Sequence, residues 1–116
     1  AAAQQRSMLV TKHGADVAKT VHVTARDIDV LLGRGQPFQR HPGTVAMMKM
    51  VEDARSEHEE AGLFAKKGIT KRIVNAIKSK GGFFLQRTDD DMWIEVSDSK
   101  AHEKVAMGFR NLARKD

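Results

Sequence analysis

The stretch DVLLGRGQPFQRHPG, residues 29–43, contains side chains and backbone that could bind an anion. A short apolar run leads into Gly33-Arg34-Gly35, and a polar loop then carries Arg40 and His41. Glycines permit a positive φ or the close approach of another group. Amides and a guanidinium group on such a loop can bind a phosphate. Taken alone, the tripeptide is more simply a tight turn with an incidental arginine, and it is not a P-loop because Gly-Lys-Ser/Thr and GxGxxG are both missing.

A second concentration of positive charge lies between residues 66 and 87. This block has seven basic residues and no acidic one, whereas acidic residues predominate at 52–60 and 89–98. The chain of 116 residues has a net charge of +5. A basic block of this kind favours an anionic partner on one face. The alternative is a solvated helix face whose charges pair with the acidic neighbours.

Side chains suited to catalysis are sparse. The chain has no cysteine and no tyrosine, so neither disulfides nor a cysteine-based zinc site can form. The serines stand in cap or linker positions, the carboxylates cluster in solvated runs, and the five histidines lack metal-binding spacing. We therefore expect no enzymatic activity, no cofactor and no metal. We also expect no membrane span, because no apolar run approaches the ~20 residues that a span requires.

Apolar periodicity predicts three helices. The first should run from an N-cap at Thr44 to about Glu60, with His58 packed and hydrogen-bonded on its buried face. The second should run from about Ala65 to Ser79 and end at Gly81-Gly82. Its isoleucines face the core, and its outward stripe consists of Lys67, Lys71 and Lys78. Ser97 or Asp98 should cap the third, C-terminal helix.

Three segments of the predicted domain have the pattern of strands. Residues 28–32 predict a short buried strand, and residues 83–85 and 93–96 predict a β-hairpin across an aspartate-rich turn. Trp93 is expected to pack in the core, and any contact of the hairpin with nucleic acid is expected through Gln86 and Arg87 rather than through its tip. Residues 1–25 are expected to be a flexible tail or linker, although residues 20–24 alternate like a short strand.

The predicted fold is therefore a small single α+β domain over residues 26–114, built from two helices, a β-hairpin and a C-terminal helix. Two helices followed by a hairpin are loosely winged-helix-like: the second helix would read the nucleic acid and the hairpin would be the wing.

Several different short motifs follow one another along the same region. They are Asp29-Val30-Leu31-Leu32-Gly33-Arg34-Gly35, His41-Pro42-Gly43, Gly81-Gly82, Phe84-Leu85, Trp93, Glu95-Val96, Lys104-Val105 and Arg110. Over residues 28–112 this series resembles an uncharacterised domain family expanded in diatoms and other stramenopiles, with the pattern DVLxGRG, HPGN, GGRFL and WxEV. The chain departs from that pattern at Thr44, Met47, His58 and Phe83, where the family usually has Asn, an aromatic residue, Tyr and Arg. The resemblance implies the domain boundaries and no particular activity.

We expect a non-catalytic nucleic-acid-binding module. The second-helix lysines would contact phosphates, and an arginine of the loop would reach a base edge or the minor groove. Duplex DNA is preferred over RNA because no exposed aromatic stacking surface is indicated. The expected contacts are Arg34, Arg40, His41, Lys67, Lys71, Lys78 and Arg87.

This hypothesis requires that the loop and the second helix converge on one surface. It also favours the nucleus over the cytoplasm as the location. The alternative is a protein–protein interaction or self-association module, including a homodimer, that uses the acidic face of the first helix and the aspartate-rich hairpin tip.

Overall fold

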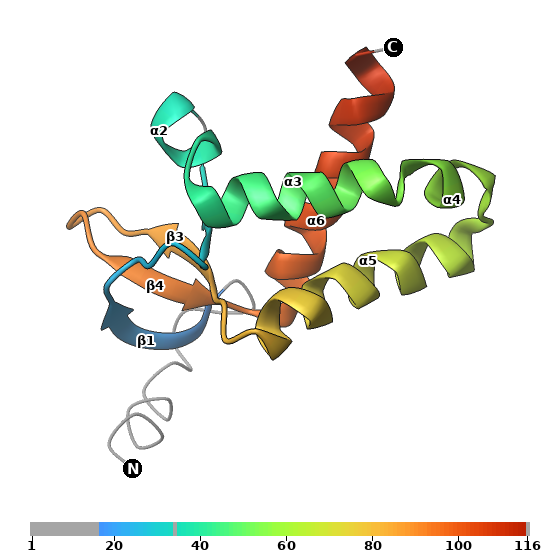
Figure 1. Ribbon diagram of the computed structural model, residues 1–116. Coiled ribbons are helices and arrows are strands. Elements are labelled where there is room, and N and C mark those ends of the chain that lie inside the picture. The colour runs from blue at the N-terminus through green and yellow to red at the C-terminus, as the bar shows by residue number, and fades with distance from the viewer. Residues whose placement is uncertain (1–16, 34, 116) are drawn as a thin grey trace.

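Figure 1 shows a computed structural model in which a sheet lies at one end of the molecule and the main helices lie at the other. The structure describes residues 17–33 and 35–115. The strands are β1 (Val17–Val23), β2 (Val30–Leu32), β3 (Phe84–Arg87) and β4 (Trp93–Val96). The helices are α2 (Gln36–Gln39), α3 (Pro42–Asp53), α4 (Arg55–Glu60), α5 (Leu63–Ser79) and α6 (Asp98–Lys115). The predicted α+β class is confirmed.

The four strands form one sheet in the order β1-β4-β3-β2. The predicted hairpin is present as β3 and β4, which pair antiparallel with Leu85 opposite Glu95. β2 instead pairs parallel to β3, with Val30 opposite Phe84. Parallel neighbours require a long crossover, and the segment from α2 to α5 provides it. The crossover helices α2 to α5 therefore begin after β2 and end before β3, its neighbour in the sheet.

β1 corrects the predicted domain boundary. It pairs antiparallel with β4, with His22 opposite Ile94 and Val23 opposite Trp93. The prediction of a flexible tail over residues 1–25 is therefore wrong for residues 17–23, while residues 1–16 lie outside the described residues. The alternating pattern at 20–24 was the local signal for this strand. Its partner lies far along the chain, so no local pattern identifies the pairing.

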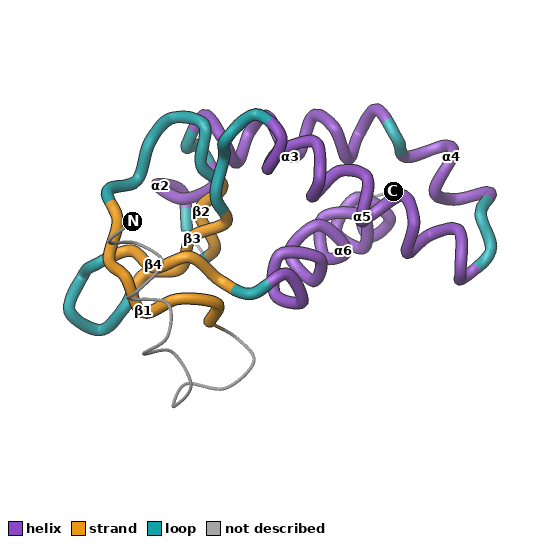
Figure 2. The backbone as a smooth tube through the Cα atoms, turned by 90° about the horizontal axis from the view of Figure 1, so that it is seen from below, coloured by secondary structure: helices purple, strands orange, loops and turns teal. Residues whose placement is uncertain are grey.

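The core lies between the sheet and the three long helices, which Figure 2 shows from below. α3 and α5 both pack against α6, and α3 also contacts β2. The isoleucines of α5 face inward as predicted, and all three are buried. The buried residues that make up the cluster are Val30, Leu32, Met47, Val51, Ala54, Ile69, Ile73, Val74, Ile77, Phe84, Val96, Ala101, Val105, Phe109 and Leu112.

The predicted first helix is divided into α3 and α4 at Ala54, whose φ of −94° and ψ of 3° depart from helical values. α4 has no buried residue, so core packing does not hold it in line with α3. The predicted N-cap is also wrong, because His41 occupies that position and Pro42 begins the helix. Thr44 is buried one turn later, where its Oγ1 accepts a hydrogen bond from the Leu31 N–H at 3.0 Å. It therefore ties α3 to β2.

The likeness to a winged helix-turn-helix is loose. The hairpin β3–β4 does follow the helices α3 to α5, but it forms the centre of the four-stranded sheet rather than a free wing. A short helix, α2, also occupies the loop that precedes α3.

Gly43 sits where α3 passes the turn before β2. A Cβ atom there would lie 2.0 Å from the Asp29 carbonyl oxygen and 2.9 Å from that of Asp27. Because these neighbours are backbone atoms, Gly43→Ala should lower the free energy of unfolding by at least about 2 kcal/mol, measured by urea denaturation. Gly68→Ala is the control: it lies inside α5 with nothing near its Cβ position, and should raise stability by about 0.5–1 kcal/mol. Equal stabilities would contradict the close approach at Gly43.

Candidate nucleic-acid interface

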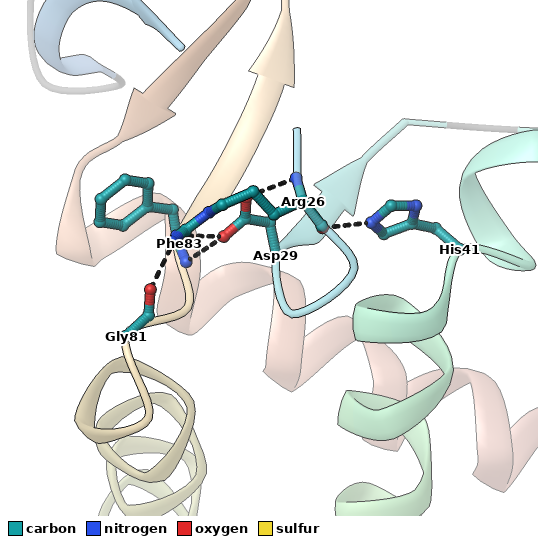
Figure 3. Close-up of polar contacts among 5 residues, drawn as sticks. All are labelled: Arg26, Asp29, His41, Gly81 and Phe83. Carbon is teal, nitrogen blue, oxygen red and sulfur yellow. Dashed lines mark hydrogen bonds and ion pairs between the residues drawn. The ribbon is translucent and has the colours of Figure 1, made fainter. Parts of the chain in front are cut away.

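The carboxylate of Asp29 is fully buried and joins separate segments of the chain (Figure 3). Its Oδ2 accepts hydrogen bonds from the Arg26 backbone N–H at 2.8 Å and from Arg26 Nε at 3.2 Å. Its Oδ1 accepts from Arg26 Nη2 and from the Phe83 N–H, both at 2.9 Å. Arg26 Nη2 also donates to the Gly81 carbonyl at 2.8 Å. The carboxylate therefore fixes the turn before β2 to the residues that lead into β3.

Charge assists this network. The hydrogen bond to Asp29 raises the pKa of Arg26, so the guanidinium remains charged. The same guanidinium lies over the Phe83 ring, 4.9 Å from its centroid. The ring and the amide of Phe83 thus both contact the Arg26–Asp29 pair.

His41 belongs to this network rather than to an open anion site. Its Nε2 lies 2.7 Å from the Arg26 carbonyl oxygen (Figure 3). A carbonyl only accepts, so Nε2 carries a proton and donates it. His41 is therefore occupied in linking the start of α3 to the segment that holds Asp29. The expectation that it contacts nucleic acid gains no geometric support.

The glycines of the loop do adopt unusual conformations, as the sequence analysis allowed. Gly33 has a φ of +139°, and a Cβ there would lie 2.8 Å from Cδ2 of Phe38. The Phe38 ring in turn meets Trp93 edge to face, with centroids 5.6 Å apart. The group that approaches Gly33 is therefore an aromatic ring of the same chain, not a ligand. Arg34 lies outside the described residues, and Arg40 is exposed in the turn between α2 and α3.

A cavity of about 660 Å³ lies between α5 and α6, with His58 of α4 contributing to its lining. We call it the α5/α6 cleft. In Figure 1 the two helices meet where α5 ends and α6 begins, and they diverge from there. Lys78 and Asp98 form an ion pair between these two ends. The other lining residues are Leu63, Lys66, Lys67, Thr70 and Lys71 of α5 and Ser99, His102, Glu103, Ala106 and Arg110 of α6.

Four cations on the cleft have no ion-pair partner within the described part of the chain: Lys66, Lys67, Lys71 and Arg110. The one carboxylate in the lining, Glu103, lies 3.6 Å from Nζ of Lys100. Elsewhere the acidic neighbours do neutralise the basic block. Arg72 binds Glu57 at 2.7 Å, and Arg87 binds Asp91 at 3.1 Å. The hydrogen bond from Lys78 lowers the pKa of Asp98, which keeps that carboxylate charged beside it.

The predicted convergence of the loop and the second helix is wrong for the residues that can be placed. Arg40 and His41 precede α3, whereas Lys67 and Lys71 lie in the first half of α5. α3 and α4 together carry the chain roughly 25 Å away before α5 begins. Figures 1 and 2 both place α2 and the start of α5 at opposite ends of the molecule. Of the six predicted contacts that the structure describes, the lining of the cleft includes only Lys67 and Lys71.

The cleft adds residues that were not predicted as contacts, chiefly Lys66, His102 and Arg110. Lys66 was visible as part of the basic block and Arg110 as part of a basic helix face. Their proximity depends on how α5 packs on α6, which the sequence does not specify.

His58 is packed, as predicted. Its ring stacks on Phe109 with centroids 3.8 Å apart and an interplanar angle of 5°. Burial lowers the pKa of His58, and the charge of Lys66 lowers it further, so the imidazole is neutral at pH 7. Over residues 17–33 and 35–115, no group of three or more His, Cys, Asp or Glu residues could hold a metal ion. No helix in these same ranges is both long and apolar enough to cross a membrane.

The structure is a small α+β domain with a cleft that is lined by several cationic side chains. The chain belongs to the family described as Domain of unknown function (DUF6824), whose family model matches residues 29–111. The match begins at Asp29 and includes His41, Gly43, Gly81 and Phe83, whereas Arg26, the main partner of the Asp29 carboxylate, precedes it. No curated protein and no solved structure matches the chain.

The Asp29 network predicts that replacing Asp29 lowers the free energy of unfolding far more than replacing the nearby Asp27. Asp29→Asn removes the charge and turns an amide NH₂ toward the donors of Arg26 and Phe83, so it should lower the free energy of unfolding by on the order of 2–3 kcal/mol. Asp27→Asn changes an exposed side chain and should stay within about 0.5 kcal/mol of the unchanged protein. Urea denaturation measures both, and a similar result for the two variants would argue against Asp29 as the hub.

Proposed function

We propose that this domain is a non-catalytic nucleic-acid-binding module that contacts phosphates through the α5/α6 cleft. The observation that supports this is the set of four cations around the cleft that lack ion-pair partners among the described residues. Lysine and arginine only donate hydrogen bonds and phosphate oxygens only accept them, so the two sets are complementary. The proposal therefore retains Lys67 and Lys71 as phosphate contacts and adds Lys66 and Arg110.

The other predicted contacts take smaller parts in this proposal. Lys78 and Arg87 are held in exposed ion pairs, which are worth about 0–1 kcal/mol and can be exchanged. Their partner carboxylates would nevertheless stay close by and repel a phosphate. Arg40 is exposed but lies beyond the opposite end of α3, so it reaches the same nucleic acid only if that molecule extends along the domain.

The reason given for preferring duplex DNA does not hold. Phe64 is 91% exposed and Leu63 is 77% exposed at the start of α5. Phe64, Lys67 and Lys71 are spaced i, i+3, i+7 and so share one stripe of the helix. An exposed aromatic residue beside phosphate-binding lysines is compatible with unpaired bases as well as with a duplex. The proposal therefore covers both DNA and RNA. A location in the nucleus and the resemblance to a family expanded in diatoms remain proposals that rest on the sequence alone.

A protein-interaction module is the second candidate, and the exposed Leu63 and Phe64 favour it. The acidic surfaces on which that alternative was first based are partly neutralised. Glu59 pairs with Arg55 at 3.0 Å, and Glu57 pairs with Arg72. A partner would therefore have to use the apolar corner between α4 and α5 rather than an acidic face.

Lysine substitutions test the proposed function. Lys67→Ala and Lys71→Ala should each weaken binding to random duplex DNA and reduce the slope of log affinity against log salt by about 1, because each removes one phosphate contact. Fluorescence anisotropy between ~50 and ~200 mM NaCl measures this slope, over a range in which phosphate-driven binding falls steeply. Lys49→Ala removes the same charge from an exposed position on α3, outside the cleft, and should leave the slope unchanged.

Two results would count against the function. If the unchanged protein binds neither duplex nor single-stranded nucleic acid at ~50 mM salt, the protein-interaction candidate takes its place. If Lys49→Ala and Lys71→Ala reduce the slope equally, binding follows net charge and not the cleft.

A further inference from the structure

We propose that the α5/α6 cleft binds an unpaired nucleotide, with its phosphate on Lys67, Lys71 and Arg110 and its base inside the cavity. This inference rests on the proposed function insofar as the nucleotide belongs to a single strand of nucleic acid. A free nucleotide offers the same chemistry to the same site.

The size and shape of the cleft suit such a ligand. Its volume of about 660 Å³ falls within the range of roughly 300–1,000 Å³ that is typical of small-molecule sites. The phosphate backbone of a duplex can follow a basic surface, but its bases are stacked and paired and cannot enter a cavity. An unpaired base can turn out of the strand and place its flat face against protein.

The polar groups of the lining match the two parts of a nucleotide. Lys67, Lys71 and Arg110 supply donors for the phosphate, and Glu103 is already engaged by Lys100. Nε2 of His102 is buried and has no hydrogen-bond partner among the described residues. That atom is covered by protein, so His102 would meet a base in the cavity through the part of its ring that lines the cleft.

The apolar part of the lining favours a nucleotide over an acidic peptide helix. A docked amphipathic helix needs a groove for several apolar anchors spaced along one face. Here the aliphatic residues of the lining are only Leu63 and Ala106, which is enough for one ring. Phe64 is next to Leu63 in the chain and offers an exposed ring on which a neighbouring base of the same strand can stack.

The test compares a fluorescein-labelled single-stranded decamer with a duplex of the same sequence. The unchanged protein should bind the single strand on the order of tenfold more tightly, because stacking adds to the phosphate contacts. Ala106→Phe places a ring in the cavity and should remove most of this preference, while the salt slope changes far less. Ala46→Phe, an identical substitution at an exposed position of α3, is the matched control and should behave like the unchanged protein.

Adenosine monophosphate and inorganic phosphate separate the base from the phosphate. The nucleotide should displace the labelled single strand at concentrations at which inorganic phosphate does not. If Ala106→Phe fails to fold by circular dichroism, Phe64→Ala replaces it, because a side chain that is 91% exposed contributes little to the core. This second variant should lower single-strand affinity several-fold and leave duplex affinity unchanged.

The outcomes distinguish this inference from the function on which it rests. Equal binding of single strand and duplex, with no effect of Ala106→Phe, overturns the nucleotide site and leaves the phosphate-binding function intact. Binding of adenosine monophosphate without binding of either nucleic acid supports the cleft as a free-nucleotide site and overturns the proposed function. In the last case, adenosine monophosphate displaces neither the labelled single strand nor the duplex, and a glutamate-rich amphipathic peptide binds in a way that Ala106→Phe abolishes. This result overturns the inference in favour of a protein partner.

Discussion

The buried carboxylate of Asp29 imposes the constraint on which the rest of the domain depends. A buried charge is tolerated only when it is paired and hydrogen-bonded, so the chain must bring Arg26 and the Phe83 amide to the same place. That requirement sets β2 beside β3 and brings the start of α3 against the turn that holds the carboxylate. The Gly43 close approach and the Thr44 hydrogen bond then follow as consequences of how near these segments lie.

The glycines and the histidine of the loop therefore have structural roles that leave little room for a ligand. The histidine donates to a carbonyl, one glycine accommodates a backbone oxygen, and another accommodates a phenyl ring. The proposed binding surface lies instead toward the other end of the molecule, where α5 and α6 diverge. There, the pairing of charges is decided by neighbours in space. Arg72 faces α4 and Lys78 faces the start of α6, each meeting a carboxylate, whereas Lys67 and Lys71 face the open cleft.

Local patterns in the sequence were enough for α5, α6 and the β3–β4 hairpin, because each depends on periodicity or on a turn within a few residues. They failed where partners are distant in the chain, as in the pairing of β1 with β4 and the parallel pairing of β2 with β3. The Gly-Arg-Gly tripeptide shows the same limit. Both glycines adopt the positive φ that the sequence allowed, and Gly33 is closely approached by another group. Spacing alone does not tell whether the approaching group is a ligand or another part of the chain.

The same limit applied to the site. The stripe of Lys67 and Lys71 follows from helical spacing, whereas the addition of Arg110 depends on the packing of two helices that are separated by the hairpin. The prediction that Arg40 and His41 lie beside that stripe was wrong because α3 and α4 separate the loop from α5.

The family match starts at Asp29, yet two features that complete the fold lie before it. Arg26 supplies three of the four hydrogen bonds to the central carboxylate, and β1 covers the outer edge of β4. A polypeptide trimmed to residues 29–111 would keep every matched motif but would bury a poorly compensated charge and present an unpaired strand edge, which is a template for aggregation. The autonomous folding unit is consequently longer than the segment by which the family is recognised.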